Sequence, residues 1–134
     1  MILSRGFASA GLVAIALAGL APAIAAPDAE PRLSLSQETA LQCSALFAVV
    51  ARDPAYAWAR PPGFVPRARE YFVITTAALM DEARLNRDQV TGLFAARVQQ
   101  AQRALAGASG QQQPVMRSLQ PCLGLLDREV PLRR

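Results

Sequence analysis

Two cysteines, Cys43 and Cys122, constrain the fold of this chain more than any other feature, because a bond between them would tie an early helical stretch to the last one. In an exported chain, two cysteines most often pair with each other. The closed loop would hold about 80 residues, and the chain-entropy model assigns such a loop about 4–5 kcal/mol of stabilisation. We therefore predict an intramolecular Cys43–Cys122 disulfide. Two free thiols or an intermolecular bond are the alternatives.

The N-terminal residues predict export. Met1–Arg5 carries one positive charge, Gly6–Ala21 is apolar and uncharged, and Ala23-Ile24-Ala25 has the small-x-small form of a cleavage site. Together they match a secretory signal peptide, so we predict cleavage of residues 1–25 near Ala25 and a periplasmic or secreted protein. An uncleaved anchor is the alternative, but the apolar run of about 16 residues is shorter than the ~20 that span a bilayer. We predict no transmembrane span in the mature chain.

Length and charge indicate one small domain without a nucleic-acid partner. The chain has 134 residues with a net charge of +4, and all of its positive side chains are arginines. Cleavage near Ala25 would leave about 109 residues, enough for one modest core. A mildly basic balance of this kind is not the charge pattern of a nucleic-acid-binding domain.

The hydrophobic spacing predicts an all-α fold, a small four-helix bundle stapled by the Cys43–Cys122 disulfide. The expected helices start after Ser34 and end near Arg52, run over 67–85, start after Asn86 and end at Gly107, and start at Pro114, with a kink or break at Pro121. We predict a disordered segment over 26–33, a single helical domain over 34–128 and a flexible tail over 129–134. The segment 107–113 is expected to be a flexible loop.

Two helix starts carry a capping box, in which a side chain before the helix and one three residues later satisfy each other's backbone amides. Ser34 with Gln37 forms the first and Asn86 with Gln89 the second, and Ser36 is an alternative cap for the first helix. The apolar stripe of that helix comprises Ala40, Cys43, Leu46, Phe47 and Val50. Cys43 therefore belongs to the predicted core.

The same two starts resemble a known motif. Leu33–Gln37 and Leu85–Gln89 are similar to the LTxxQ signature of Spy-type periplasmic helical chaperones, with Ser34 or Asn86 in place of its threonine. In outline, a small exported helical bundle with one long-range disulfide also resembles the HdeA-type acid-stress chaperones. The pattern is similar to the uncharacterised small exported two-cysteine helical proteins of Gram-negative bacteria. The chaperone resemblances imply binding of unfolded polypeptides.

The residue inventory argues against most enzyme chemistry. The chain has no histidine, no Cys-x-x-Cys pair and no glycine-rich phosphate loop. We predict that it is not an enzyme and has no metal and no cofactor. A carboxylate-based hydrolase is the alternative, and its candidate residues are Glu70, Asp81, Glu82 and Asp88.

The segment 53–66, DPAYAWARPPGFVP, and its flanks contain the most suggestive candidate surface. Arginines and aromatic residues alternate there, namely Arg52, Tyr56, Trp58, Arg60, Phe64, Arg67 and Arg69. Arginine recognises anions through paired hydrogen bonds, and aromatic rings provide flat apolar contact. Such a surface could bind an anionic ligand, a lipid headgroup or an unfolded polypeptide. The other interpretation is a proline-braced loop whose aromatics complete the core while its arginines face water.

We therefore expect a non-enzymatic role, either binding or a structural part of an envelope assembly. The expected partner is a protein or an anionic envelope ligand. A chaperone-like stress protein that binds unfolded polypeptides is the alternative function, and it would need an exposed apolar patch near Trp58 and Phe64.

Overall fold

Helix α1 (Leu35–Arg52), which contains Cys43, is the central element of the fold. In the computed structural model, residues 30–108 and 111–133 are described, and the predicted signal peptide lies outside them. The elements that follow are the short 3-10 helix η1 (Pro54–Ala59), α2 (Phe64–Glu82), α3 (Arg87–Gly107) and α4 (Gln112–Glu129). The all-α prediction is confirmed, and so is the Cys43–Cys122 disulfide, with its S–S bond of 2.04 Å.

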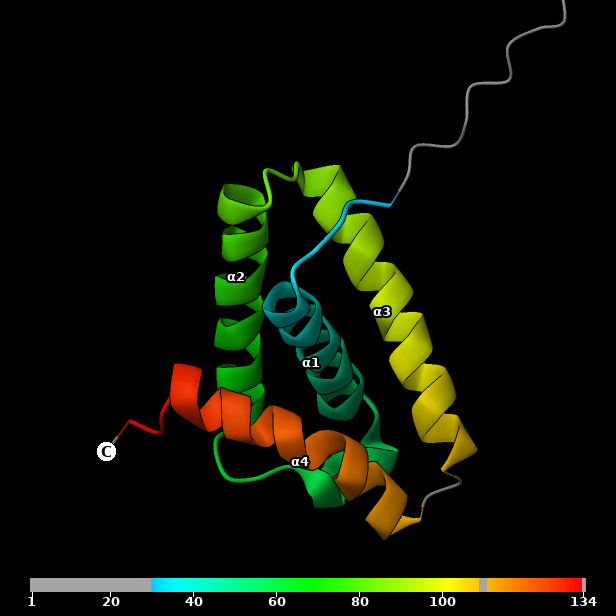
Figure 1. The fold of residues 1–134 in the computed structure, drawn as a ribbon. Helices are drawn as coiled ribbons and strands as arrows, with labels where there is room; N and C mark the ends of the chain where they lie inside the picture. Colours follow the sequence, from blue (N-terminus) through cyan, green and yellow to red (C-terminus); the bar gives the residue numbers. More distant parts are fainter. Residues whose placement is uncertain (1–29, 109–110, 134) are drawn as a thin grey trace, which may run out of the picture. The chain divides into compact units, whose positions relative to one another are not determined.

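The helices α2, α3 and α4 are arranged around α1, and each packs against it (Figure 1). Helices α2 and α3 meet at the turn between them and then diverge, with α1 lying in the space between them. Helix α4 crosses α1 and α2 at the end of the bundle that lies away from the α2–α3 turn. Most tertiary contacts of the fold therefore involve α1, whereas α2 and α3 contact each other much less.

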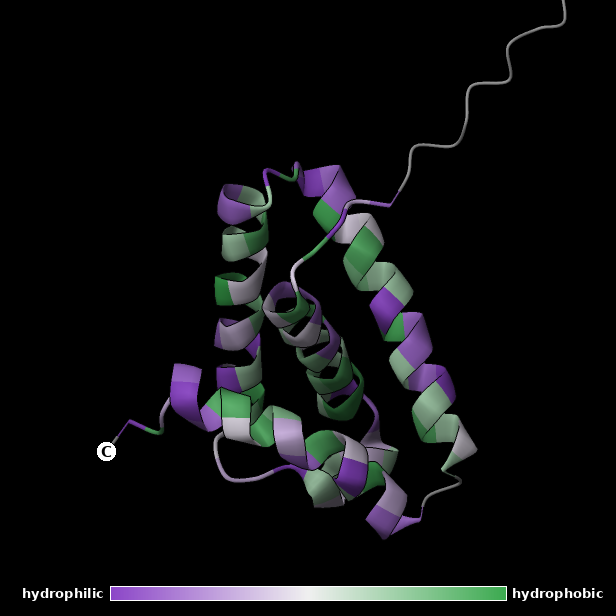
Figure 2. Cartoon of the chain, in the orientation of Figure 1, coloured by the Kyte–Doolittle hydropathy of each residue, from purple (hydrophilic) through white to green (hydrophobic). Residues whose placement is uncertain are grey.

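The core lies along the buried side chains of α1. Phe47 is fully buried and makes edge-to-face contacts with Phe64 and Tyr71 of α2, at ring-centroid distances of 5.5 and 5.4 Å. The largest cluster also includes Leu119 and Leu126 of α4. Figure 2 shows the hydrophobic residues gathered in the C-terminal half of α1, whereas α3 alternates hydrophobic and hydrophilic residues along its length. Helix α3 therefore buries a narrow stripe and leaves much of its surface to solvent.

Both predicted capping boxes are present. The Ser34 hydroxyl accepts a hydrogen bond from the Gln37 amide at 3.2 Å, and the Ser34 amide donates to the Gln37 side chain at 2.9 Å. Asn86 and Gln89 exchange the same pair of bonds at 2.9 Å. Local sequence therefore determines where α1 and α3 begin.

Helix α2 begins three residues earlier than predicted. Gly63 adopts a left-handed conformation with φ of 67°, and the helix starts at Phe64 directly after it. Pro66 then falls in the first turn, where a backbone amide has no partner within the helix, so its missing N–H costs nothing. The segment predicted as irregular also contains η1, whose first free amide, that of Ala55, donates to the Asp53 carboxylate at 2.9 Å.

The C-terminal part also differs from the prediction. Helix α4 begins at Gln112 and runs unbroken through Pro121, which removes one backbone hydrogen bond without splitting the helix. The predicted break at Pro121 is therefore wrong, and Leu119 and Cys122 are buried on either side of the proline. Val130, expected in a flexible tail, is 4% exposed and belongs to the core.

We predict that replacing both cysteines with serine lowers the free energy of unfolding by about 2–5 kcal/mol, because the disulfide joins residues 79 apart and restricts the unfolded chain. Urea denaturation followed by circular dichroism measures the difference. The wild-type protein in excess reductant serves as the control and should match the variant. A midpoint within experimental error of the oxidised wild type would contradict the stabilising role.

Candidate functional site

A cleft of about 960 Å³ opens between α2 and α3, with α1 as its floor. Its volume lies at the upper end of the ~300–1,000 Å³ that small-molecule sites typically occupy. We call it the α2–α3 cleft. It is lined by Ser44, Phe47, Ala48, Val49, Ala51, Arg52 and Asp53 from α1 and its C-cap, Tyr56 from η1, Val65, Ala68, Arg69 and Phe72 from α2, and Phe94, Ala95, Val98, Gln99, Gln102 and Ala106 from α3.

Two small residues in the floor and the divergence of the walls keep the cleft open. Ala48 and Ala51 present only methyl groups between the two flanking helices. At one end the walls meet, where the rings of Phe72 and Phe94 pack at an angle of 57° with centroids 4.7 Å apart. From there α2 and α3 diverge away from their connecting turn, as Figure 1 shows. The cleft is therefore narrow and aromatic at one end and wide at the other.

Polar side chains line the cleft from its middle to its wide end. Arg52 and Gln102 lie toward the wide end, whereas Arg69 and Gln99 are within about one and a half helical turns of Phe72 and Phe94. All four side chains are exposed, and neither arginine forms an ion pair within the described part of the chain. The Asp53 carboxylate also lies here, and it accepts the amide hydrogen bond that caps η1.

The floor of the cleft contains one polar side chain away from that end, Ser44. It is 2% exposed, and its hydroxyl has no hydrogen-bond partner among the described residues. Because the oxygen itself is buried, the surface that this part of the cleft offers to a ligand is hydrocarbon. An unsatisfied buried hydroxyl costs about 1–3 kcal/mol, so the site is a small local weakness of the core.

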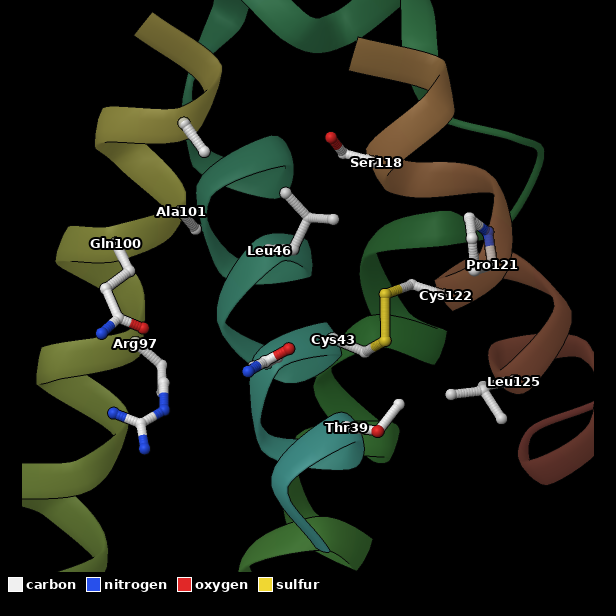
Figure 3. Close-up of a pocket in the computed structure, with 12 residues that line it drawn as sticks. Thr39, Cys43, Leu46, Arg97, Gln100, Ala101, Ser118, Pro121, Cys122 and Leu125 are labelled. Carbon is white, nitrogen blue, oxygen red and sulfur yellow. A yellow bond between two sulfur atoms is a disulfide. The ribbon is translucent and has the colours of Figure 1, made fainter. Parts of the chain in front are cut away.

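A second cleft, of about 470 Å³, lies between α3 and α4 on another side of α1. We call it the α3–α4 cleft. It is lined by Thr39, Gln42, Cys43, Leu46, Arg97, Gln100, Ala101, Ala104, Ser118, Pro121, Cys122 and Leu125. Figure 3 shows the disulfide spanning from α1 to α4, with Arg97 and Gln100 on the opposite α3 wall. The two sulfur-bearing residues are buried, so this cleft is a seam over the disulfide rather than an enclosed cavity.

An ion pair beside this seam holds α3 to α1. Arg97 donates from Nε to Glu38 Oε1 at 2.6 Å and from Nη2 to Oε2 at 3.0 Å, a two-pronged geometry that is among the stronger charged contacts. The hydrogen bond from Arg97 lowers the pKa of Glu38 below its ordinary value of 4.5, against the opposing effect of burial. Arg97 is therefore a structural contact between α3 and α1.

The predicted arginine and aromatic surface does not form one continuous face. Arg52 and Arg69 are exposed in the α2–α3 cleft, and Tyr56 is half-buried at its edge. Trp58 is 42% exposed but lines neither cleft, whereas Phe64 is 2% exposed within the core. Phe64 therefore fits the interpretation of a loop whose aromatics complete the core, whereas Arg52 and Arg69 remain exposed as a binding surface would require.

Arg60 and Arg67 of that set hold the backbone in place. Arg60 donates to the carbonyls of Val50 and Asp53 at 2.8 and 2.9 Å. Arg67 is 7% exposed, and its Nε donates to the Val130 carbonyl at 2.6 Å while its Nη2 donates to the Asp127 carboxylate at 2.6 Å. Both arginines bind groups of this chain, and of the two only Arg67 is buried.

The carboxylates considered for hydrolysis lie apart from both clefts. Glu70, Asp81, Glu82 and Asp88 are all exposed, and none of them lines a cleft. Glu70 is within 3.7 Å of Arg133, and Glu82 accepts a weak hydrogen bond from Gln37 at 3.4 Å. Among the described residues no group of three or more His, Cys, Asp or Glu side chains is placed to hold a metal ion.

Sequence reasoning missed the contribution of α3 to the α2–α3 cleft. Phe94, Gln99 and Gln102 come from a helix whose apolar face was read only as core. The signal for a cleft in the sequence was the pair Ala48 and Ala51, one helical turn apart in α1. Both side chains are too small to fill the space between two helices. That signal gains meaning only when the flanking helices are known to diverge.

Comparisons of the chain with protein-family models, with curated proteins and with solved structures found no match. Within the described residues, no helix combines the length and apolar character required to cross a bilayer. The disulfide is typical of a protein that folds in an oxidising compartment.

We predict that Arg67→Ala lowers the free energy of unfolding by about 2–4 kcal/mol, since it removes two hydrogen bonds of a charged donor and leaves the Val130 carbonyl without its partner. The matched control is Arg69→Ala on the same helix, which is exposed and should change stability by less than about 0.5 kcal/mol. Thermal unfolding compares the two. Equal effects would show that Arg67 has no special structural role.

We predict that the stabilising effect of the Glu38–Arg97 pair depends on pH. Because the folded-state pKa of Glu38 is lowered, the pair stabilises the fold above pH 4.5 and loses this effect as pH falls through the folded-state pKa. Glu38→Gln should cost on the order of 1 kcal/mol at pH 7, with the difference from wild type shrinking below pH 4.5. Urea titrations across this range test it, with Glu70→Gln as the exposed control. A difference that stays constant down to pH 3 would contradict the prediction.

Proposed function

We propose that this protein is a non-enzymatic binding module that acts in the periplasm after removal of a signal peptide and holds an apolar ligand in the α2–α3 cleft. The observation that carries the proposal is a large open cleft with a mostly apolar lining, which includes Ala48 and Ala51 in its floor and Phe72 and Phe94 in its walls. A concave, largely apolar surface with a few polar groups at its rim is the usual form of a small-molecule site.

Three features support binding rather than catalysis. The cleft lining contains a single carboxylate, Asp53, and that group already caps η1. No histidine exists in the chain, and both cysteines are joined in the disulfide. The lining therefore offers apolar contact and anion recognition, and it lacks a paired acid and base.

The chaperone alternative has less support. Its predicted surface joined Trp58 and Phe64, but Phe64 is buried and Trp58 stands outside both clefts. Exposed apolar residues lie instead on α2, at Val73, Ile74 and Met80. None of these three residues lines a cleft, so the α2–α3 cleft is the better-defined site.

We predict that the purified oxidised protein binds the uncharged dye Nile red in the α2–α3 cleft, with a rise in dye fluorescence. Ala95→Glu places a carboxylate on the cleft wall at an exposed position of α3, and we expect it to weaken binding at least about tenfold, since a charge facing an apolar ligand must be desolvated. The measurement is a fluorescence titration.

Ala96→Glu is the matched control for this test. Ala96 is the next residue of the same helix, is equally exposed and lines neither cleft. Ala96→Glu should bind the dye as the wild type does. Equal loss in both variants, or no dye binding by the native protein, would overturn the proposed function.

A further inference from the structure

The α2–α3 cleft is apolar at its narrow end and carries polar side chains from its middle outward, and this arrangement identifies a class of ligand. Its narrow end is closed by Phe72 and Phe94, with Ser44 and Ala48 on the floor. Its wide end presents Arg52 and Gln102, both of which are exposed. Ser44 and Arg52 are two helical turns apart on α1, about 12 Å. A ligand that fills the cleft therefore needs an extended apolar part and a polar head.

The charge at the wide end indicates an anionic head. Arg52 and Arg69 both line the cleft, and neither has an ion pair among the described residues. A guanidinium can donate two parallel hydrogen bonds to a carboxylate. The Asp53 carboxylate offsets one of the two positive charges. The remaining balance suits a singly charged carboxylate better than a phosphate monoester, which carries about −1.5 to −2 at neutral pH.

The walls favour a hydrocarbon chain over an extended peptide. All lining segments are helical or lie at helix ends, so the cleft has no strand edge to pair with a peptide backbone. An extended peptide would bury its amide groups against Phe47, Phe72 and Phe94, which offer no hydrogen bonds. The Ser44 hydroxyl is buried beneath the floor, so it offers no hydrogen bond to a peptide amide either. A hydrocarbon chain has no polar groups to satisfy.

We propose that the α2–α3 cleft binds a single-chain fatty acid, with the hydrocarbon tail directed toward Phe72 and Phe94 and the carboxylate held between Arg52 and Arg69. This inference rests on the proposed function and specifies its ligand. It depends on the charge and polarity at the wide end, whereas the proposed function depends only on the apolar cleft.

The test compares amphiphiles with the same tail and different heads, namely decanoate, 1-decanol and decyltrimethylammonium, each below its aggregation concentration. Isothermal titration calorimetry on the oxidised protein gives each Kd, and amide shifts in NMR spectra locate the site. Decanoate should bind at least about tenfold tighter than decyltrimethylammonium, because hydrogen bonds to a charged partner contribute that much or more. Octanoate should bind more weakly than decanoate by about fourfold for each methylene removed.

The variant test is the double substitution Arg52→Gln and Arg69→Gln. We expect it to weaken decanoate binding at least about tenfold while decanol binding stays within about twofold. Arg117→Gln is the control, because Arg117 is an exposed arginine on α4 that lines neither cleft. The control should bind decanoate as the wild type does. Arg52 and Arg69 are both exposed, so the double variant is expected to fold, and circular dichroism verifies this.

The outcomes separate the two proposals. Decanol and Nile red binding without a preference for decanoate would overturn the fatty-acid assignment and leave the binding module intact. No binding of any amphiphile or dye would overturn both. Tight binding of an apolar peptide with no binding of decanoate would overturn the assignment in favour of a polypeptide ligand. A ligand-free dimer that Ala95→Glu dissociates would show that a second copy fills the cleft, which would also overturn it.

Discussion

The burial of α1 is the constraint on which the rest of this structure depends. Helices α2 and α3 pack mainly on α1 and make few contacts with each other, and α4 packs against both α1 and α2. The exposed polar residues of α1 are concentrated near its start, and its second half is buried on nearly every side. A helix surrounded in this way needs apolar residues around most of its circumference, and the run ALFAVVA at 45–51 provides them.

The same arrangement explains why two clefts remain open. Large residues on α1, such as Phe47 and Leu46, fill the space under one neighbouring helix at a time. Where α1 presents Ala48 and Ala51 instead, the flanking helices have nothing to pack against, and α2 and α3 stay apart. The cleft is thus a consequence of residue size on the central helix, and replacing alanine by leucine there would fill it.

The sequence predicts the starts of α1 and α3 and the disulfide correctly, whereas it does not predict the other features that depend on tertiary contact. The starts of α1 and α3 follow from capping residues within four positions of each other, and the disulfide follows from the presence of two cysteines. The positions of Phe64 and Arg67 were misjudged because Gly63, in a left-handed conformation, starts α2 before Pro66. The order of the final residues depends on the bond from Arg67 to the Val130 carbonyl, 63 positions away, which no local pattern encodes.

The tethers of the outer helices account for how a cleft can persist in so small a fold. Helix α4 is joined covalently to α1 through Cys122, and α3 is joined to it through the ion pair of Arg97 with Glu38. Both tethers lie on the side of α1 that faces the α3–α4 cleft, away from the α2–α3 cleft. Stability supplied at one face of the central helix removes the need for close packing at the other. The open cleft is therefore compatible with a stable fold, and its exposed arginines remain available because Arg60 and Arg67 carry the structural contacts.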